Sequence, residues 1–228
     1  MSKKVDEKII ANAPKNEYVA NKGEKFSFYL FVKRVVDIIG SILGLIVLSP
    51  LFLFIAIAIK VDSEGKVFYK HKRVGQFGKE LYIFKFRSMK ENADNLEEML
   101  SPEELEIFMN EFKLENDPRI TKVGNFLRKT SLDELPQLLN ILKGDLTLIG
   151  PRPIVEEELE NYGDDVDKLL SITPGLTGYW QAYARNDAVY ATGERQKMEL
   201  YYVDNRSFLL DVKIFFMTFI SVFKKTGN

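Results

Sequence analysis

Two adjacent carboxylates and a distant arginine are the residues of this chain whose types and spacing best suit chemistry. They are Asp133, Glu134 and, nineteen positions after the first, Arg152. A carboxylate can act as a covalent nucleophile towards a phosphoryl group, and it can also bind a divalent cation. Prolines on both sides of Arg152 fix the backbone that carries its permanently charged guanidinium. The pattern indicates a nucleophile facing an anion-binding arginine; simple capping of a helix start by the two acids is the competing interpretation.

A helix must position the two carboxylates. Pro136 is tolerated only in a first helical turn, and Gly144 favours a helix end. With Ser131 as the cap, a Ser-x-x-Glu capping box would form, but the ring of Pro136 would clash with the turn before it. We therefore predict the N-cap at or close to Asp133. Both carboxylates then lie in the positive field of the helix N-terminus, which also attracts phosphate.

Several longer motifs occur together with this pair. The chain reads NDPRITKVGNFLRKTSLDELPQ and then LLNILKGDLTLIGPRP, and it also contains VFYKHKRVG, YIFKFRSM and TPGLTGYWQ. In these motifs, over about residues 28 to 223, the chain resembles the bacterial sugar transferases. These are the monotopic phosphoglycosyl transferases that load a sugar phosphate onto polyprenyl phosphate.

The resemblance implies a mechanism in which Asp133 attacks the sugar-linked phosphate of a UDP-sugar. A covalent aspartyl-phosphosugar intermediate would form and UMP would leave, after which polyprenyl (undecaprenyl) phosphate would take the phosphosugar. Glu134 would hold Mg²⁺, which prefers one or two carboxylates together with substrate phosphate oxygens. Such a reaction is the first membrane step of exopolysaccharide, capsule or other surface glycan synthesis.

Basic residues are expected to bind the substrate phosphates. The resemblance assigns Arg152 to the diphosphate, with help from Lys85 and Arg87 in the YIFKFRSM motif. Arg119 and Arg128 precede the carboxylates closely enough to join the same phosphate pocket. Structural salt bridges are the alternative use for these last two arginines.

The composition of the 228 residues narrows the classes of protein. The net charge is −1, so we expect no nucleic-acid partner. The absence of cysteine excludes disulfides, thiolate metal sites and a cysteine nucleophile. Charge is distributed locally, since residues 60–90 hold nine Lys or Arg against three acids, and residues 91–117 hold ten acids against one Lys. Basic residues beside an apolar segment favour contact with anionic lipid.

Residues 38–59 are twenty-two residues without a charge. As a helix they would measure about 33 Å, against a hydrocarbon core of about 30 Å. Ser49 and Pro50 lie near the middle, where proline kinks a helix and serine can bond to the freed carbonyl. Basic residues flank both ends, whereas a spanning helix leaves its richer basic flank inside. These features, and the Ser-Pro break of the resembled family, predict a re-entrant helix; a kinked single span is the alternative.

The sequence divides into three predicted parts. Residues 1–27 are a flexible polar tail, residues 28–60 the re-entrant membrane helix, and residues 61–228 a catalytic domain on the cytoplasmic face of a bacterial cell membrane. Residues 208–223 are apolar but interrupted by charge, which predicts a helix in the membrane interface.

The predicted fold is mainly α with a small β-hairpin (α+β), mounted on the re-entrant helix and on interfacial amphipathic helices. Apolar and basic residues alternate around Gly75 to Gly78, which predicts the hairpin. An acidic helical stretch follows over residues 91–117, with a break at Pro102. Helices are also expected over residues 154–170 and 194–202.

Other interpretations stay open at this point. His71 is the only histidine and stands where the family more often has glutamine; its basic neighbours favour a surface or lipid contact. A non-catalytic membrane adaptor could use the same hairpin and interfacial helices, although it would not need the acidic pair with Arg152. A transferase that binds metal through Asp165 and Asp167 would act without a covalent intermediate, and ping-pong kinetics would distinguish it. The sequence does not fix the hexose, and a homo-oligomer is compatible with it.

Overall fold

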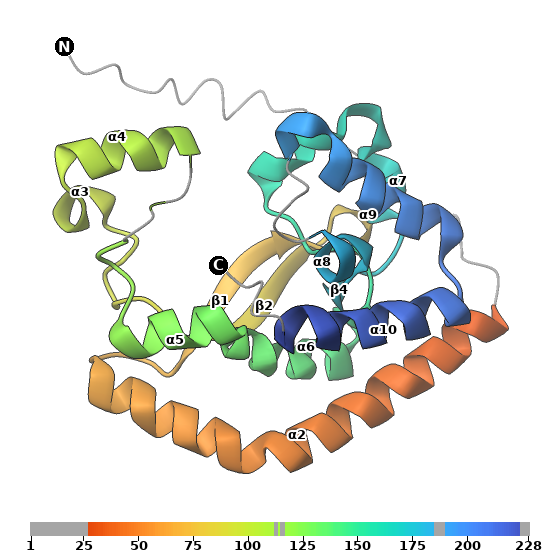
Figure 1. Cartoon of the computed structure of the whole chain (residues 1–228), viewed down its shortest axis with the longest axis horizontal. Helices are drawn as coiled ribbons and strands as arrows, with labels where there is room; N and C mark the ends of the chain where they lie inside the picture. Colours follow the sequence, from red (N-terminus) through yellow and green to blue (C-terminus); the bar gives the residue numbers. More distant parts are fainter. Residues whose placement is uncertain (1–26, 112–113, 115–116, 185–189, 224–228) are drawn as a thin grey trace.

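A single long helix, α2 (Phe28–Asp62), runs along one side of the molecule, and the rest of the chain packs against its inner side (Figure 1). The structure is a computed structural model, and it describes residues 27–111, 114, 117–184 and 190–223. The predicted polar tail therefore lies outside the described residues, apart from its last residue, Ser27.

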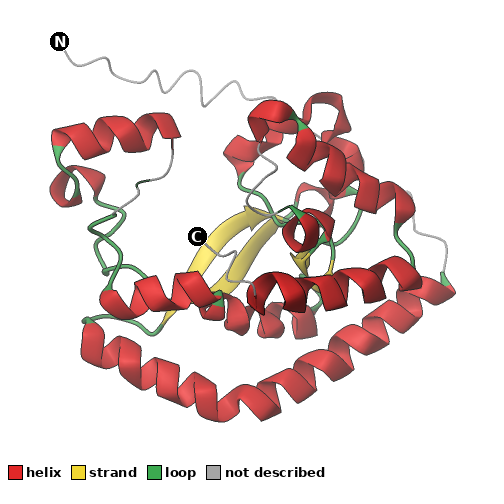
Figure 2. Cartoon of the chain, in the orientation of Figure 1, coloured by secondary structure: helices red, strands yellow, loops and turns green. Residues whose placement is uncertain are grey.

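Helices make up most of the described chain, with short strands at its centre (Figure 2). After α2, the helical elements are α3 (Leu96–Met99), α4 (Pro102–Glu111), α5 (Lys122–Thr130), α6 (Leu138–Lys143), α7 (Val166–Leu170), α8 (Tyr179–Tyr183), α9 (Glu194–Asn205) and α10 (Phe208–Phe223), and the 3₁₀-helices are η1 (Gln76–Gly78), η2 (Leu132–Gln137), η3 (Glu156–Asp165) and η4 (Tyr190–Thr192). The strands are β1 (Phe68–Val74), β2 (Glu80–Phe86), β3 (Thr147–Ile149) and β4 (Gly175–Thr177). The predicted class, mainly helical with a small hairpin, is confirmed.

The bend in α2 lies in its middle (Figure 1). Pro50 lies inside the helix and has no amide to give to the carbonyl of Ile46, four residues earlier. The hydroxyl of Ser49 donates to that carbonyl instead, at 2.8 Å. The contact expected between Ser49 and a freed carbonyl is thus present, and it satisfies the group that proline leaves without a partner.

Polar side chains attach the first half of α2 to the domain. Arg34 donates to the carbonyls of Ile141 and Leu142 at 2.6 and 2.8 Å, which caps the end of α6. Asp37 accepts from the Thr147 hydroxyl at 2.7 Å and from the next backbone amide at 2.8 Å. Because these groups are buried or partly buried, the contacts fix this half of the helix against α6 and β3.

The second half of α2 is attached to the same body by a different part of its surface. Ile55 and Ile59 are buried in one apolar cluster with Phe86. At the helix end, Asp62 accepts from the backbone amide of Val123 at 2.9 Å, at the start of α5. Both halves of the bent helix therefore contact one domain.

Two glycines of α2 lie at its closest contacts with the domain. A Cβ atom on Gly40 would come within 3.1 Å of Leu148, and one on Gly44 would come equally close to Leu138. The small-residue face of the helix is consequently used within the chain.

The predicted hairpin is β1 paired antiparallel with β2, with η1 in its turn. Leu81 and Ile83 are buried against α6, whereas Lys85 continues the same face at the end of β2. In the register, His71 lies opposite Ile83 and Arg73 opposite Leu81. The inner face of the hairpin thus begins in the core and ends in charged residues.

A second sheet, which the sequence did not indicate, pairs β3 with β4 in parallel. Its backbones approach so closely that a Cβ on Gly175 would lie 2.1 Å from the amide nitrogen of Gly150. Strands of three residues are too short to show a period of two, which explains why the sequence did not reveal them.

The acidic stretch forms α3 and α4, which lie apart from the other helices in Figure 1. The break expected at Pro102 is confirmed. Ser101 and Glu104 exchange side-chain and backbone hydrogen bonds at 2.8 and 3.2 Å, a capping box at the start of α4.

Large apolar side chains are exposed along α2 and α10. Phe28 is 75% exposed and Val47 72% on α2, and Leu209 is 72% exposed on α10. Among the described residues, α2 is the helix long and apolar enough to cross a membrane, with a mean hydropathy of 2.9 over its most apolar 18 residues, of which only 11% are buried. Apolar surface of this extent marks an interaction with a membrane or a partner.

Candidate functional site

Asp133 and Glu134 lie in η2, directly after α5. The predicted N-cap at Asp133 is wrong. Ser131 closes α5 in the left-handed conformation, the chain continues as a 3₁₀-helix through Pro136, and the α-helix starts only at Leu138. A proline ring clashes with the preceding turn of an α-helix, so a 3₁₀-helix in place of the first α-helical turn is the expected accommodation. The predicted end is confirmed, since Gly144 is the left-handed C-cap of α6.

Lys85 connects the hairpin to the acidic pair. Its Nζ lies 2.9 Å from Oε1 of Glu134 and 3.9 Å from Oδ2 of Asp133. Burial raises the pKa of Asp133, which is 7% exposed, while Lys85 and Arg128 lower it. The predicted nucleophile is thus a buried carboxylate whose ionised form depends on neighbouring cations.

Three of the predicted phosphate-binding residues gather around one imidazole. Burial, followed by Arg73, Lys85, Arg152 and Arg128, lowers the pKa of His71 to about 4. Such cation effects fall off with distance, which indicates that these side chains lie near His71. The region combines the inner face of the hairpin, the end of α5 and the loop after β3, and it is strongly positive.

Arg152 lies in a loop whose backbone is fixed on each side. The carbonyl of Pro151 accepts from the Gly175 amide at 2.8 Å, and the amide of Arg152 donates to Glu199 at 3.1 Å. Within the described residues, the guanidinium of Arg152 has no ion pair or hydrogen bond. It is therefore a cation held by its backbone and available to an anion.

Arg87 and Arg119 are instead engaged by contacts with the surrounding chain. Arg87 is 7% exposed and donates to the carbonyl and hydroxyl of Ser63, at 2.8 and 3.0 Å, and to the carbonyl of Glu64. It closes the loop after α2. Arg119 makes two hydrogen bonds to Asp117, at 2.8 and 2.7 Å, and stacks on Phe108 at 4.3 Å. The structural alternative left open for Arg119 is the one observed.

Two residues of the hairpin that the sequence reasoning did not assign to the site also belong there. His71 is half-buried, with Nδ1 3.3 Å from the Arg73 guanidinium, rather than on an outer surface against lipid. Burial and then Arg152 lower the pKa of Arg73 to about 10. The hairpin register contained the signal, because residues 71 and 73 share the face of Lys85.

Helix α9 carries a second group of residues that the sequence reasoning missed. Arg195 lies between the rings of Trp180 and Tyr190, at 4.1 and 3.9 Å from their centroids, and 3.5 Å from Glu158. Glu199, one turn further on, is 1% exposed. Arg195 and Glu199 are four residues apart on one helix. This spacing is the only feature of the sequence that indicates that the two side chains act together.

A magnesium ion fits the acidic pair in one way. No cluster of three or more His, Asp or Glu side chains suited to a metal occurs in the described part of the chain. Asp133 and Glu134 supply two carboxylates, which is the number that Mg²⁺ commonly takes from a protein when phosphate oxygens and water complete its shell. The residues present therefore suit a metal that arrives with, or is shared by, a diphosphate.

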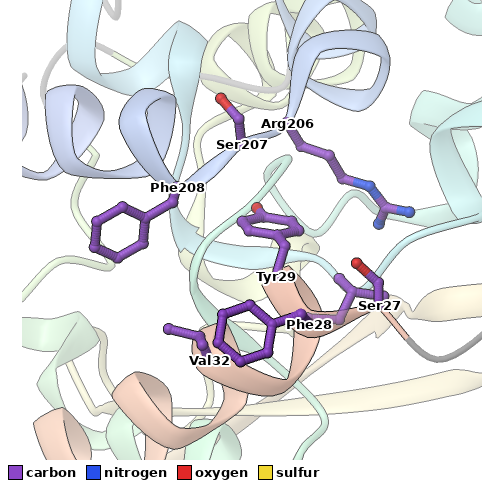
Figure 3. A pocket seen from close by; sticks show the side chains of 8 residues that line it. Ser27, Phe28, Tyr29, Val32, Arg206, Ser207 and Phe208 are labelled. Carbon is purple, nitrogen blue, oxygen red and sulfur yellow. The ribbon is translucent and has the colours of Figure 1, made fainter.

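A cavity of about 790 Å³ lies elsewhere, between the start of α2 and the junction of α9 with α10 (Figure 3). Its lining is mainly apolar and contains none of the predicted site residues. The residues that line it are Ser27, Phe28, Tyr29, Leu30, Val32, Arg206, Ser207 and Phe208. The group of charged residues around Asp133, and not this cavity, has the composition of a phosphate site.

Known proteins are similar to this chain over the candidate site and most of its length. The profile of the family described as bacterial sugar transferase matches residues 28–225. The chain is 48% identical over 200 residues to the undecaprenyl-phosphate galactose phosphotransferase of Salmonella typhimurium, covering 86% of this chain and 41% of that protein. It is 46% identical over 199 residues to the exopolysaccharide production protein ExoY of Sinorhizobium fredii, covering 86% and 87%.

A third relative is the UDP-glucose:undecaprenyl-phosphate glucose-1-phosphate transferase of Escherichia coli, 37% identical over 205 residues, covering 86% of this chain and 40% of that protein. The chain thus spans about two fifths of the Salmonella and Escherichia proteins and most of ExoY. The family match includes α2, the hairpin, the acidic pair and the loop of Arg152. This chain belongs to the bacterial sugar transferase family.

Proposed function

We propose that this protein transfers a sugar 1-phosphate from a UDP-sugar to undecaprenyl phosphate and releases UMP. The names of the relatives support the two substrates and the reaction class. The observation that carries the proposal is the buried Asp133 beside the partly buried Glu134, both within reach of Lys85. They lie in a region where the guanidinium of Arg152 has no partner among the described residues. The product would begin an exopolysaccharide, a capsule or another surface glycan.

In the first step, a carboxylate oxygen of Asp133 forms a bond to the sugar-linked phosphorus. The bond from that phosphorus to the bridging oxygen breaks, and UMP leaves with the bridging oxygen. Lys85 and Arg128 favour the ionised nucleophile against the effect of its burial. In the second step, an oxygen of undecaprenyl phosphate attacks the same phosphorus and regenerates the carboxylate of Asp133.

Cations neutralise the charge that moves during both steps. Arg152 binds the diphosphate and stabilises the leaving group, with Arg73 and Lys85 beside it. Glu134 would hold Mg²⁺, which when bound supplies further charge neutralisation at the phosphate oxygens. Because Glu134 already pairs with Lys85, the lysine can hold the carboxylate in place before the substrate binds.

Membrane attachment through a re-entrant α2 is part of this proposal. One domain contacts both ends of the helix, through Arg34 and Asp37 before the bend and Asp62 after it. A straight span would place those ends on opposite faces of a bilayer, out of reach of a single domain. The exposed apolar residues of α2 and α10 then enter the lipid, and the active site lies at the cytoplasmic headgroups, where nucleotide sugar and lipid phosphate can meet.

Two other candidate functions have less support. Asp165 and Asp167, proposed for a metal-bound transferase without a covalent intermediate, are both exposed and lie where η3 meets α7. An adaptor would gain nothing from the buried carboxylate of Asp133, since burying unneeded charge costs free energy.

The proposal is tested by incubating membranes that contain the protein with undecaprenyl phosphate and a panel of radiolabelled UDP-sugars. We expect one or a few sugars to give labelled lipid together with an equal amount of UMP. Membranes with the Asp133→Asn variant are the matched control. Release of UDP in place of UMP would contradict phosphosugar transfer, and no nucleotide release with any sugar would favour the adaptor.

A further inference from the structure

The loop of Arg152 contains one backbone donor. Pro151 and Pro153 have no amide, so Arg152 has the single N–H group of the three residues. That N–H donates to Oε2 of Glu199 at 3.1 Å. The direction of the loop at its central residue is therefore set by one carboxylate, which comes from a helix more than forty residues later in the chain.

Helix α9 contacts this segment at three successive points. The hydroxyl of Tyr202 shares its one proton between the carbonyl of Ile149, at 3.1 Å and before the loop, and the carboxylate of Asp211, at 2.6 Å. Within the loop, Glu199 accepts a hydrogen bond from the amide of Arg152. After the loop, Arg195 lies 3.5 Å from Glu158. Residues 195, 199 and 202 share one face of the helix by their spacing. The face of α9 thus fixes the path of residues 149–158 at its start, its middle and its end.

Glu199 occupies an unfavourable position for a carboxyl group. It is 1% exposed, and its Oε1 is buried without a hydrogen-bond partner in the described part of the chain. Burial raises the pKa of Glu199 to about 7, although Arg195 and Arg152 lower it; Glu158 raises it further. A residue that served only to fill space would cost less as an apolar side chain of the same size.

We propose that Glu199 is a positioning residue for phosphosugar transfer: by accepting the amide of Arg152, it fixes the guanidinium of Arg152 in the direction of the diphosphate. This inference rests on the proposed function for its effect on activity. Its geometric part, the restraint of the Arg152 amide, does not depend on that function.

The first test is a double-mutant cycle with Glu199→Met, Glu199→Gln and Arg152→Ala. Glu199→Met removes the acceptor at nearly constant volume, whereas Glu199→Gln keeps an acceptor oxygen. We expect Glu199→Met to lower kcat about tenfold with little change in KM, and to lower it less than about twofold in the Arg152→Ala background, because residues that act as a unit are non-additive. Glu199→Gln should keep kcat within about threefold of wild type.

The matched control is Glu194→Met, an acid in the first turn of the same helix that is exposed. It should leave kcat unchanged in both backgrounds. A loss from Glu199→Met that is equal in the wild-type and Arg152→Ala backgrounds would mean a general structural role and would overturn the proposal.

The second test needs no activity. Hydrogen exchange of the Arg152 amide, followed by NMR or by mass spectrometry of overlapping peptides, reports the contact directly because prolines flank it. We expect exchange about tenfold faster in Glu199→Met and nearly unchanged in Glu199→Gln and Glu194→Met. Unchanged exchange in Glu199→Met would refute the restraint. If the wild type made no product from any UDP-sugar, the proposed function would fail, and the exchange rates would still decide the role of Glu199.

Discussion

Lys85 is shared unequally by the two acids, since its ammonium lies 2.9 Å from Glu134 and 3.9 Å from Asp133. The closer contact pairs Glu134 with the lysine. Asp133 lies further from the lysine in a buried place, where burial raises its pKa and Lys85 and Arg128 lower it. A nucleophile benefits from such an arrangement, because a tight hydrogen bond would occupy the attacking oxygen. The unequal distances therefore support the proposed division of roles, with covalent chemistry at Asp133 and metal binding at Glu134.

The two acids should differ when each is replaced by its amide. Asp133→Asn cannot form an acyl phosphate, so neither labelled protein nor UMP should appear. Glu134→Gln should weaken the dependence on Mg²⁺ and slow both steps, while still trapping some labelled enzyme. The measurement uses UDP-sugar labelled in the sugar-linked phosphate, no lipid acceptor, a denaturing gel and hydroxylamine, which cleaves acyl phosphates. Hydroxylamine-sensitive label on Asp133→Asn protein would move the nucleophile elsewhere, with Glu134 as the next candidate.

Replacing Arg152 should affect activity and not stability, whereas replacing Arg119 should affect stability. Arg152→Ala should lower turnover more than about a hundredfold, the scale of removing a preorganised electrostatic contact, and should leave the melting temperature unchanged. Arg119→Ala removes the ion-pair partner of the partly buried Asp117 and should cost about 2 kcal/mol of stability, the scale of a hydrogen bond to a charged group. Thermal melts and initial rates of both purified variants check this pair. A stable, active Arg119→Ala protein, or near-normal rates for Arg152→Ala, would contradict the assignments.

His71 should affect stability in acid and not catalysis near neutral pH. Its pKa in the folded protein is about 4, below the ordinary value of 6.5, so the unfolded chain binds the proton more readily. The contribution of His71 to stability is therefore present above pH 6.5 and is lost as the pH falls towards 4. At pH 7.5 the melting temperatures of His71→Gln and wild type should be similar. At pH 5 the melting temperature of His71→Gln should be the higher of the two.

The same variant should keep the wild-type dependence of rate on pH between 6.5 and 8, because His71 is neutral there. Melting curves at both pH values and a pH–rate profile provide the check. A titration step near pH 6.5 that disappears in His71→Gln would show that the imidazole takes part in proton transfer.

Topology is testable with single cysteines, since the natural chain has none. Cysteines placed by Ser2→Cys, before α2, and by Lys79→Cys, in the hairpin turn, should both be protected from an impermeant thiol reagent in intact cells. Both should react once the cells are opened. Labelling of Ser2→Cys alone in intact cells would establish a kinked span in place of a re-entrant helix.

Features that depend on neighbouring residues in the chain were predictable. Pro50 and Gly144 act through their own backbone limits, so the bend and the end of α6 followed from sequence. The left-handed Ser131 did not, because a non-glycine residue adopts that conformation only when the surroundings compensate. The same holds for the 3₁₀ start of the helix that carries the acidic pair.

The site itself was predictable in part. Asp133, Lys85 and Arg152 were identified by residue type and motif, and the structure places them in one region. The same motif contains Arg87, two residues after Lys85. In the structure, Arg87 closes the loop after α2 by hydrogen bonds. Only tertiary packing distinguishes the two, and only tertiary packing brings Glu199 to the loop after β3.

The bend at Pro50 affects how the protein can be inserted. In the proposed re-entrant geometry, α2 displaces lipid from a single leaflet, so it widens that leaflet while the opposite one keeps its area. Insertion then moves no charged segment across the bilayer, and the domain can fold before, during or after the helix enters the lipid. An amphiphile that expands the same leaflet would compete for this space, so the proposed geometry links the amount of bound protein to the lateral pressure of that leaflet.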